Sequence, residues 1–190
     1  MLAADTDSRL VLEQFSDNPF LARFYEDPER YAFQLELSFL SERYQQIKAD
    51  LGHPDLFGQG VISDYYLAKS FIFSKHNLKD DELLLFEKLY TIMNLQVPKP
   101  DLYIYLHVPI GRLLENIAQR GRSYEKHIRE DYLKEVQDGY FGFFKSQTDL
   151  KIVAIDTGNI DFVNKKSDYE MLKNLIFDRE YSVGLNRLIL

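Results

Sequence analysis

The alternation of short apolar segments with longer helical stretches limits the fold of this chain more than any other feature. Four segments have the composition and length of strands: residues 9–13, 61–64, 101–106 and 151–156. The segment over 101–106, rich in aromatic and branched residues, is expected to be buried on both faces. Stretches with helical periodicity separate them, and a strand that returns through a helix normally pairs in parallel with its predecessor. The sequence therefore predicts an α/β protein, with a parallel sheet covered by helices on both faces.

The expected helices are marked by their ends as well as by their periodicity. Pro28 falls in the first turn of a helix that runs to about residue 49. Three acidic residues, 80–82, open a helix that ends near residue 95. Pro109 precedes a helix over 110–119, and a last one is expected over 169–177. The final dozen residues favour neither helix nor strand.

Length and composition exclude several classes of protein. The 190 residues are 45% hydrophobic, which suits one domain spanning residues 1–190 with a packed core. The formal net charge of −7 argues against a general binder of nucleic acid or of a membrane surface, since both require a basic face. There is no cysteine, no apolar run of membrane-spanning length and no recognisable signal peptide. We expect a cytoplasmic domain that binds neither nucleic acid nor membranes.

Acidic residues stand at the carboxyl ends of three predicted strands: Glu13, Asp64 and Asp156. Open parallel sheets bind their ligands at this edge. One acid after a strand is often a turn former or a helix cap. Three together are suited to holding Mg²⁺, to removing a proton from a hydroxyl or to binding ribose hydroxyls.

A short basic segment follows the third strand and its helix. Arg120 and Arg122 flank Gly121, and Glu125 comes three residues later. Two guanidinium groups beside a flexible residue are suited to binding oxyanions. A helix that ends at glycine beside a cation would explain Arg120 and Gly121, but it would not explain the second arginine or the carboxylate.

These segments, in this order, resemble the deoxynucleoside kinase family, particularly its bacterial deoxyadenosine and deoxyguanosine kinases. The resemblance runs from about residue 10 to about residue 163, and it is strongest at residues 12–13, 18–21, 24–33, 99–103 and 120–125. It implies a P-loop kinase fold and transfer of the γ-phosphoryl group of ATP, with Mg²⁺, to the 5′-hydroxyl of a deoxynucleoside. Such a step belongs to nucleotide salvage.

By position, the resemblance implies roles for five residues at the nucleoside site. Glu13 would be the general base that accepts the 5′-hydroxyl proton. Tyr25 and Glu125 would hold the 3′-hydroxyl of the sugar. Phe33 would stack on the base, although its helical spacing alone indicates a core position. Glu36 stands where the family usually has a glutamine that reads the base.

The resemblance also implies an ATP site. Arg120 and Arg122 would belong to a lid that closes over the phosphates and neutralises developing charge. Asp156 and the segment after it resemble the loop that covers the adenine. Asp64, after the second predicted strand, would stand with Glu13 among the catalytic groups.

The largest departure from the family is the phosphate-binding loop, because the string Gly-x-x-x-x-Gly-Lys-Ser/Thr does not occur in these 190 residues. In the family, this loop and the first strand precede the position that matches Met1. We therefore expect a P-loop kinase fold without its first strand, which would lie centrally between segments 61–64 and 101–106. Such a gap would expose two strand edges, so we expect a poorly stable chain.

Two smaller departures affect the site. Tyr65 follows Asp64 where the family usually has arginine, and Lys69, one helical turn on, either supplies the missing cation or is a solvated helix residue. An ionised Glu36 only accepts hydrogen bonds, which would favour the two N–H donors of guanine and hence deoxyguanosine over deoxycytidine. An alignment shifted by about a turn would place Gln34 in this role instead.

Alternatives to an active kinase stay open at this point. A non-catalytic relative that binds a nucleoside or pairs with a partner subunit would account for the absent phosphate loop, but it would not need Glu13 or the arginines. A nucleoside-monophosphate kinase fits less well, because no further basic cluster serves a phosphorylated acceptor. The four histidines, His53, His76, His107 and His127, lack the spacing of a metal site, so Mg²⁺ would arrive with ATP. The helices over 30–49 and 81–95 would allow a homodimer.

Overall fold

A computed structural model of the chain describes residues 1–14, 18–51, 59–122, 125 and 128–190. The chain forms two compact units, residues 1–98 and residues 99–190. The described strands form two parallel sheets, one in each unit, so the predicted α/β class is confirmed. His53 and His127 lie outside the described residues, and so do residues 123–124 of the segment over 120–125.

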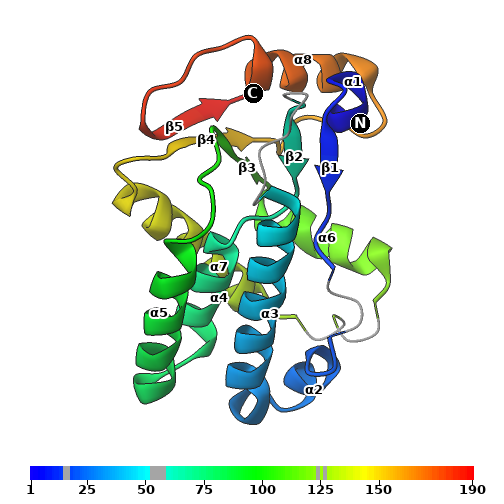
Figure 1. The fold of residues 1–190 in the computed structure, drawn as a ribbon. Coiled ribbons are helices and arrows are strands. Elements are labelled where there is room, and N and C mark those ends of the chain that lie inside the picture. The colour runs from blue at the N-terminus through cyan, green and yellow to red at the C-terminus, as the bar shows by residue number, and fades with distance from the viewer. Residues whose placement is uncertain (15–17, 52–58, 123–124, 126–127) are drawn as a thin grey trace. The chain divides into compact units, whose positions relative to one another are not determined.

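The first unit consists of a small sheet and a group of helices. Its elements are α1 (Leu2–Asp5), β1 (Arg9–Val11), α2 (Leu21–Glu26), α3 (Pro28–Leu51), β2 (Val61–Ser63), α4 (Ala68–Asn77) and α5 (Asp80–Asn94). Strands β1 and β2 are parallel, with Leu10 opposite Ile62. Helices α3, α4 and α5 lie side by side (Figure 1) and pack against one another.

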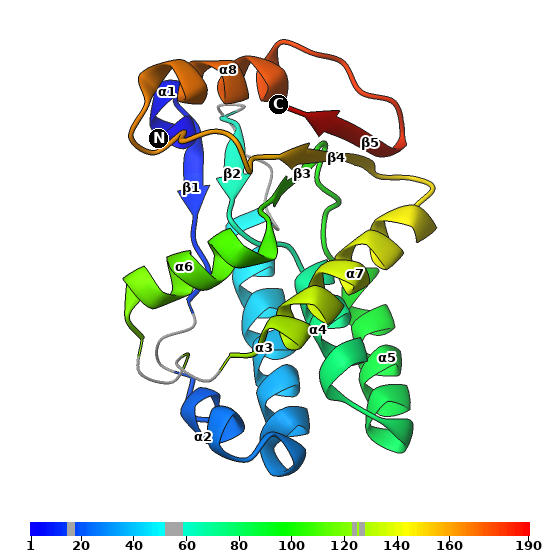
Figure 2. The ribbon, with the colours of Figure 1, turned by 180° about the vertical axis from the view of Figure 1, so that it is seen from behind.

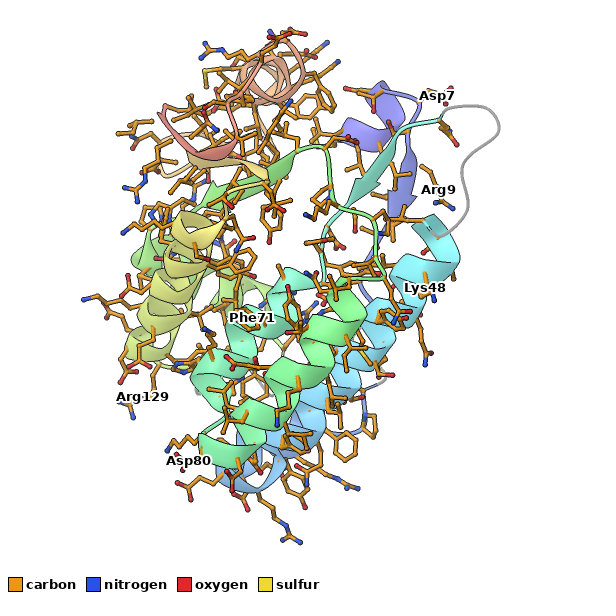
Figure 3. The ribbon with its side chains drawn as sticks, turned by 60° about the vertical axis from the view of Figure 1, so that its left-hand side comes forward. Asp7, Arg9, Lys48, Phe71, Asp80 and Arg129 are labelled. Carbon is orange, nitrogen blue, oxygen red and sulfur yellow. The ribbon has the colours of Figure 1, made fainter. Side chains whose placement is uncertain are left out.

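The core of the first unit forms between these helices. The buried face of α3 follows the three- and four-residue spacing of a helix, with Ala32, Glu36, Leu40, Arg43 and Ile47 in line and Leu35 beside them. Phe71 of α4, labelled in Figure 3, stacks on Tyr90 of α5 with ring centroids 4.7 Å apart. Two polar residues, Glu36 and Arg43, lie on the same buried face of α3 and need partners there.

The second unit is a three-stranded sheet between helices. Its elements are β3 (Tyr103–His107), α6 (Ile110–Arg120), α7 (Glu130–Ser146), β4 (Lys151–Asp156), α8 (Lys166–Phe177) and β5 (Gly184–Ile189). The strand order is β3-β4-β5, with β4 in the middle. Figure 2 shows α7 and α8 on opposite sides of β4. The carboxyl ends of β3 and β4 coincide, since His107 lies opposite Asp156.

Strand β4 has one small core on each face. Ile152 packs with Phe144 of α7, whereas Val153, on the opposite face, packs with Leu172 of α8. The segment over 101–106 was expected to be buried on both faces, and this is wrong: β3 is half-buried, with Leu106 exposed. Among the described strands β3 pairs only with β4, so one of its edges has no strand neighbour.

The structure adds elements to those predicted and shortens others. Helices α4 and α7 and strand β5 have no counterpart in the expected set. Strands β1 and β2 end at Val11 and Ser63, so Glu13 and Asp64 lie just after them rather than within them. The described strands β2 and β3 belong to different sheets, and this is where the resemblance implies a further central strand. In the described ranges, no helix combines the length and apolar character needed to cross a membrane.

Candidate functional site

Glu13 and Asp64 are brought together at the ends of β1 and β2. The backbone N–H of Glu13 donates to Asp64 Oδ1 over 2.8 Å. The backbone N–H of Asp64 donates to the carbonyl oxygen of Val11 over 3.2 Å. The second hydrogen bond continues the backbone pairing of the two strands, and the first ties the Asp64 side chain to the backbone from which the Glu13 side chain leaves.

The carboxylate of Glu13 binds two cations from two different helices. Arg43 Nε of α3 lies 2.6 Å from Oε1, and Lys69 Nζ of α4 lies 2.5 Å from Oε2. Burial raises the pKa of Glu13, but Arg43 and then Lys69 outweigh burial, and the pKa lies below its ordinary value. Glu13 is therefore a half-buried, ionised carboxylate at neutral pH. Lys69 is part of this cluster and not a solvated helix residue.

Arg43 is held in place by more than Glu13. Its Nη1 donates to Ser70 Oγ over 2.6 Å, and its guanidinium lies 4.7 Å from the ring centre of Phe39. Only 6% of the Arg43 side chain is exposed, compared with 29% for Lys69. The two cations on Glu13 thus differ in how firmly the fold fixes them.

Glu36 lies on the same face of α3, about two turns before Arg43, and it is buried. Its Oε1 accepts a hydrogen bond from Asn77 Nδ2 over 2.6 Å, whereas Oε2 has no partner among the described residues. Burial raises the pKa of Glu36 to about 7, against the smaller opposing effects of Asn77, Arg43 and Lys69. The sequence alone suggested that Glu36 is an ionised carboxylate that only accepts hydrogen bonds. With this raised pKa, its protonated and ionised forms are both populated near neutral pH.

Tyr25 on α2 and Phe33 on α3 are both half-buried and pack against the core of the first unit. The ring of Tyr25 meets that of Phe24 edge-on, with centroids 5.5 Å apart. Gln34, the alternative reader of the base, is exposed on α3. Sugar and base contacts at Tyr25 and Phe33 stay predictions.

Arg120, Arg122 and Glu125 meet in the second unit. Arg120 donates to Glu125 Oε2 from Nε over 3.0 Å and from Nη2 over 2.6 Å, and Arg122 Nη1 lies 3.2 Å from Oε1. The Glu125 side chain is only 7% exposed, whereas that of Arg120 is 46% exposed. Gly121 ends α6 in the left-handed region, with φ of 69°, as expected for a helix that stops at glycine.

The turn after β4 is tied to the end of β3. Asp156 Oδ1 accepts from the N–H of Gly158 over 2.9 Å, and Arg112 of α6 donates to the carbonyl oxygen of Gly158 over 2.8 Å. The N–H of Thr157 donates to the carbonyl oxygen of His107 over 2.8 Å. This segment is therefore a fixed turn between β3, β4 and α6.

The nine predicted site residues divide between the two units. The first contains Glu13, Tyr25, Phe33, Glu36 and Asp64, and the second contains Arg120, Arg122, Glu125 and Asp156. The described residues include no group of three or more histidines or carboxylates placed to hold a metal ion.

Sequence reasoning missed Arg43, Ser70 and Asn77. A usable signal existed for Arg43, since it falls three residues after Leu40 and four before Ile47 on an otherwise apolar helix face. No comparable signal marks Ser70 or Asn77, because their roles depend on which side chains of α3 they meet.

The model of the deoxynucleoside kinase family matches residues 1–179 of the chain. The chain belongs to the deoxynucleoside kinase family. One relative is the deoxyguanosine kinase of Bacillus subtilis. It is 34% identical to this chain over 176 residues, which cover 90% of this chain and 85% of the relative. The predicted kinase family is thereby confirmed.

Solved structures agree on the fold of this deoxynucleoside kinase family member. The deoxyadenosine kinase of M. mycoides, solved with dCMP and dCDP, superimposes with a TM-score of 0.78 at 23% identity, covering 94% of this chain and 90% of that one. A more distant relative is named as NADH dehydrogenase 1 alpha subcomplex subunit 10 of Bos taurus. It is 21% identical over 181 residues, which cover 91% of this chain and 53% of the relative.

Proposed function

We propose that this chain transfers the γ-phosphoryl group of ATP to the 5′-hydroxyl of a purine deoxynucleoside, with Glu13 as the general base. The observation that carries the proposal is the half-buried Glu13 carboxylate, which Arg43 and Lys69 keep ionised. An ionised carboxylate at the end of a parallel strand is suited to orienting a hydroxyl and accepting its proton. We also propose that the reaction takes place in the cytoplasm, in keeping with a sequence that contains no cysteine.

The reaction balances with Glu13 as the proton acceptor. The 5′-oxygen forms a bond to the γ-phosphorus while the bond from that phosphorus to the bridging oxygen of ADP breaks, and the hydroxyl proton passes to Glu13. Its pKa below the ordinary value makes Glu13 a weak base. A weak base suffices, because a loose transition state removes the proton late and depends mainly on positioning and charge.

Arg120, Arg122 and Asp156 are proposed to serve ATP. The two guanidinium groups are compensated by the single carboxylate of Glu125. One positive charge is therefore in excess and is available to the negatively charged triphosphate. The fixed turn that follows Asp156 is proposed to cover the adenine. Mg²⁺ is proposed to arrive bound to the triphosphate and to neutralise part of its charge.

Glu125 and Tyr25 are proposed to hold the 3′-hydroxyl. Both oxygens of Glu125 are already engaged by the arginines. We propose that the arginines move from Glu125 to the triphosphate, which would release a carboxylate oxygen for the sugar.

The preference for a purine, deoxyguanosine above all, is proposed to depend on Glu36. Its Oε2 is a buried acceptor without a partner among the described residues. When ionised, the carboxylate would accept from both N1–H and N2–H of guanine. When protonated, as a pKa of about 7 allows, it offers one donor and one acceptor, as glutamine does. The Bacillus subtilis relative, which is 34% identical, is a deoxyguanosine kinase, and this supports the preference.

Phosphoryl transfer from radiolabelled ATP to deoxyguanosine, deoxyadenosine and deoxycytidine tests the proposal. Glu13→Gln is expected to lower kcat by about 100-fold or more, because it removes the base. Glu29→Gln, an exposed glutamate on α3, is the matched control and should keep wild-type activity. Full activity in Glu13→Gln would refute its role as the base. An unchanged substrate ranking in Glu36→Gln would refute its role in selecting the base.

The second candidate is a non-catalytic relative that binds a nucleoside or pairs with a subunit. Tyr65, which stands where the family usually has arginine, favours it, and the Bos taurus relative is named as a subunit of NADH dehydrogenase. Calorimetry separates the two candidates. Saturable binding of deoxyguanosine without any phosphorylation at saturating ATP and Mg²⁺ would favour the non-catalytic reading.

A homodimer through α3 and α5 is also proposed. Leu84, Ile92 and Leu95 of the α5 region are exposed, Ile92 by 58% and Leu95 by 83%. Neighbouring apolar side chains this exposed are typical of a surface that pairs with another chain. Light scattering would show a mass twice that of the chain, and Ile92→Lys should reduce it to the monomer. A monomeric wild type would exclude the dimer.

A further inference from the structure

Among the groups that contact its carboxylate, Glu13 has one more cation than its charge requires. The carboxylate carries −1, and the cluster sets Arg43 and Lys69 against it, each with +1. A half-buried cluster with a surplus positive charge is costly unless an anion comes to share it. After Glu13 accepts a proton, the surplus rises to two charges. The cluster thus attracts an anion most strongly at the moment at which a phosphoryl group would reach the hydroxyl.

Of the two cations, Lys69 is the one that is able to move. Arg43 is bound by Glu13, Ser70 and the ring of Phe39, and its side chain is 6% exposed. Lys69 has a single hydrogen bond within the cluster, to Glu13 Oε2, and it is 29% exposed. Its flexible four-carbon stem allows the ammonium group to swing without moving α4.

Tyr65 cannot supply this charge. Its hydroxyl is buried without a partner among the described residues, and burial raises its pKa above the ordinary value, so that the side chain stays neutral. Asp64, the residue before it, has a carboxyl group that carries no positive charge in either protonation state, and its Oδ1 accepts a hydrogen bond from the N–H of Glu13. Of the positive charges on Glu13, only that of Lys69 therefore stands at the exposed side of the cluster.

We propose that Lys69 is the phosphate-binding cation of the nucleoside site: it leaves Glu13 when the 5′-hydroxyl binds, contacts the phosphoryl group in transfer and then holds the 5′-phosphate of the product. This inference rests on the proposed function. Arg43 remains on Glu13 throughout and is a positioning residue. The exchange keeps Glu13 paired with one cation before transfer and provides the other for the incoming negative charge.

The inference is tested by binding, without turnover. Calorimetry would compare deoxyguanosine with deoxyguanosine 5′-monophosphate in the wild type, Lys69→Met, Lys69→Arg and Lys75→Met. Lys75 is the matched control, because it lies on the same helix and is paired with Glu87 instead. Lys69→Met is expected to lower the affinity for deoxyguanosine 5′-monophosphate by about 10- to 100-fold, since a charge-assisted hydrogen bond is lost. Its affinity for deoxyguanosine should change by less than about threefold, and Lys69→Arg should restore most of the loss.

Each of four results would overturn the inference. Equal losses for nucleoside and monophosphate would mean that Lys69 only positions Glu13. A Lys69→Arg variant as weak as Lys69→Met would mean that charge is not the cause. A similar loss in Lys75→Met would mean that the effect is not local. If the wild type binds deoxyguanosine but Lys69→Met has an unchanged affinity for the monophosphate, the inference about Lys69 fails and the proposed function still stands. If the wild type binds neither ligand, the proposed function fails as well.

Discussion

Arg43 Nε lies 2.6 Å from Glu13 Oε1, although 30 residues separate the two along the chain. The pair joins the end of β1 to the middle of α3, with 6% of the Arg43 side chain and 10% of the Glu13 side chain exposed. Its geometry makes the ionised state of Glu13 depend on a residue of another element.

Replacing Arg43 should therefore destabilise the first unit. Arg43→Met leaves Glu13 with Lys69 alone and Ser70 without its donor, so we expect a loss of about 2 to 4 kcal/mol in the free energy of unfolding. The measurement is urea denaturation followed by circular dichroism. Arg9→Met is the control, since Arg9 and Asp50 form an exposed ion pair worth about 1 kcal/mol or less. Equal losses in the two variants would contradict the buried pairing.

Glu36 should make stability fall as the pH rises. Its folded-state pKa is about 7, above the ordinary 4.5, so the folded protein binds the proton more tightly than the unfolded chain does. The contribution is complete below about pH 4.5 and is lost between there and about pH 7, by roughly 3 kcal/mol at most. Glu36→Gln should remove this slope in denaturation series from pH 4.5 to 8.

The pKa of Glu13, in contrast, is lowered. Its contribution is present above its ordinary pKa and is lost only as the pH falls further, so it does not overlap with that of Glu36. A stability profile that is flat from pH 4.5 to 8 in the wild type would show that Glu36 does not carry a raised pKa.

Glu125 should determine whether the sugar 3′-hydroxyl is recognised. We expect wild-type protein to bind deoxyguanosine about tenfold or more tightly than 2′,3′-dideoxyguanosine, because a hydrogen bond to a carboxylate is lost with the hydroxyl. In Glu125→Gln this ratio should shrink towards one. Calorimetry with both nucleosides measures it. A preserved ratio would assign recognition of the 3′-hydroxyl elsewhere.

Gly158 should tolerate no side chain. A Cβ added there would lie 3.0 Å from Pro109 Cγ and 3.1 Å from Asp156 Oδ1, so Gly158→Ala forces the turn after β4 to shift. We expect a loss of about 1 to 3 kcal/mol in stability and weaker ATP binding. Gly142→Ala is the control: it lies inside α7 with nothing within 4 Å of its added Cβ, and it should be neutral or stabilising. Thermal melts with and without ATP measure both effects, and equal melts for the two variants would refute the prediction.

Some of this protein could be read from local sequence alone. Apolar runs with turn residues at their ends placed four strands, and Pro28 and the acids at 80–82 placed two helix starts, because these signals act within a few residues. Gly121 ended α6 for the same reason. The resemblance singled out Glu13, Asp64 and the segment from Arg120 to Glu125 as candidate site residues, and their roles stay predictions. The family itself is confirmed over residues 1–179.

What only the tertiary structure decided is which side chains meet across elements. Arg43 is marked in the sequence by its position between Leu40 and Ile47 on the buried face of α3, but its partners follow only from the approach of α3 to the end of β1 and to Ser70 of α4. Likewise, the pKa of Glu36 depends on burial between helices, and the partner of Lys69 depends on how α4 packs. The pKa of a side chain depends on its burial and on the charges and hydrogen bonds within a few ångströms of it in space. A local sequence pattern does not predict which groups these are.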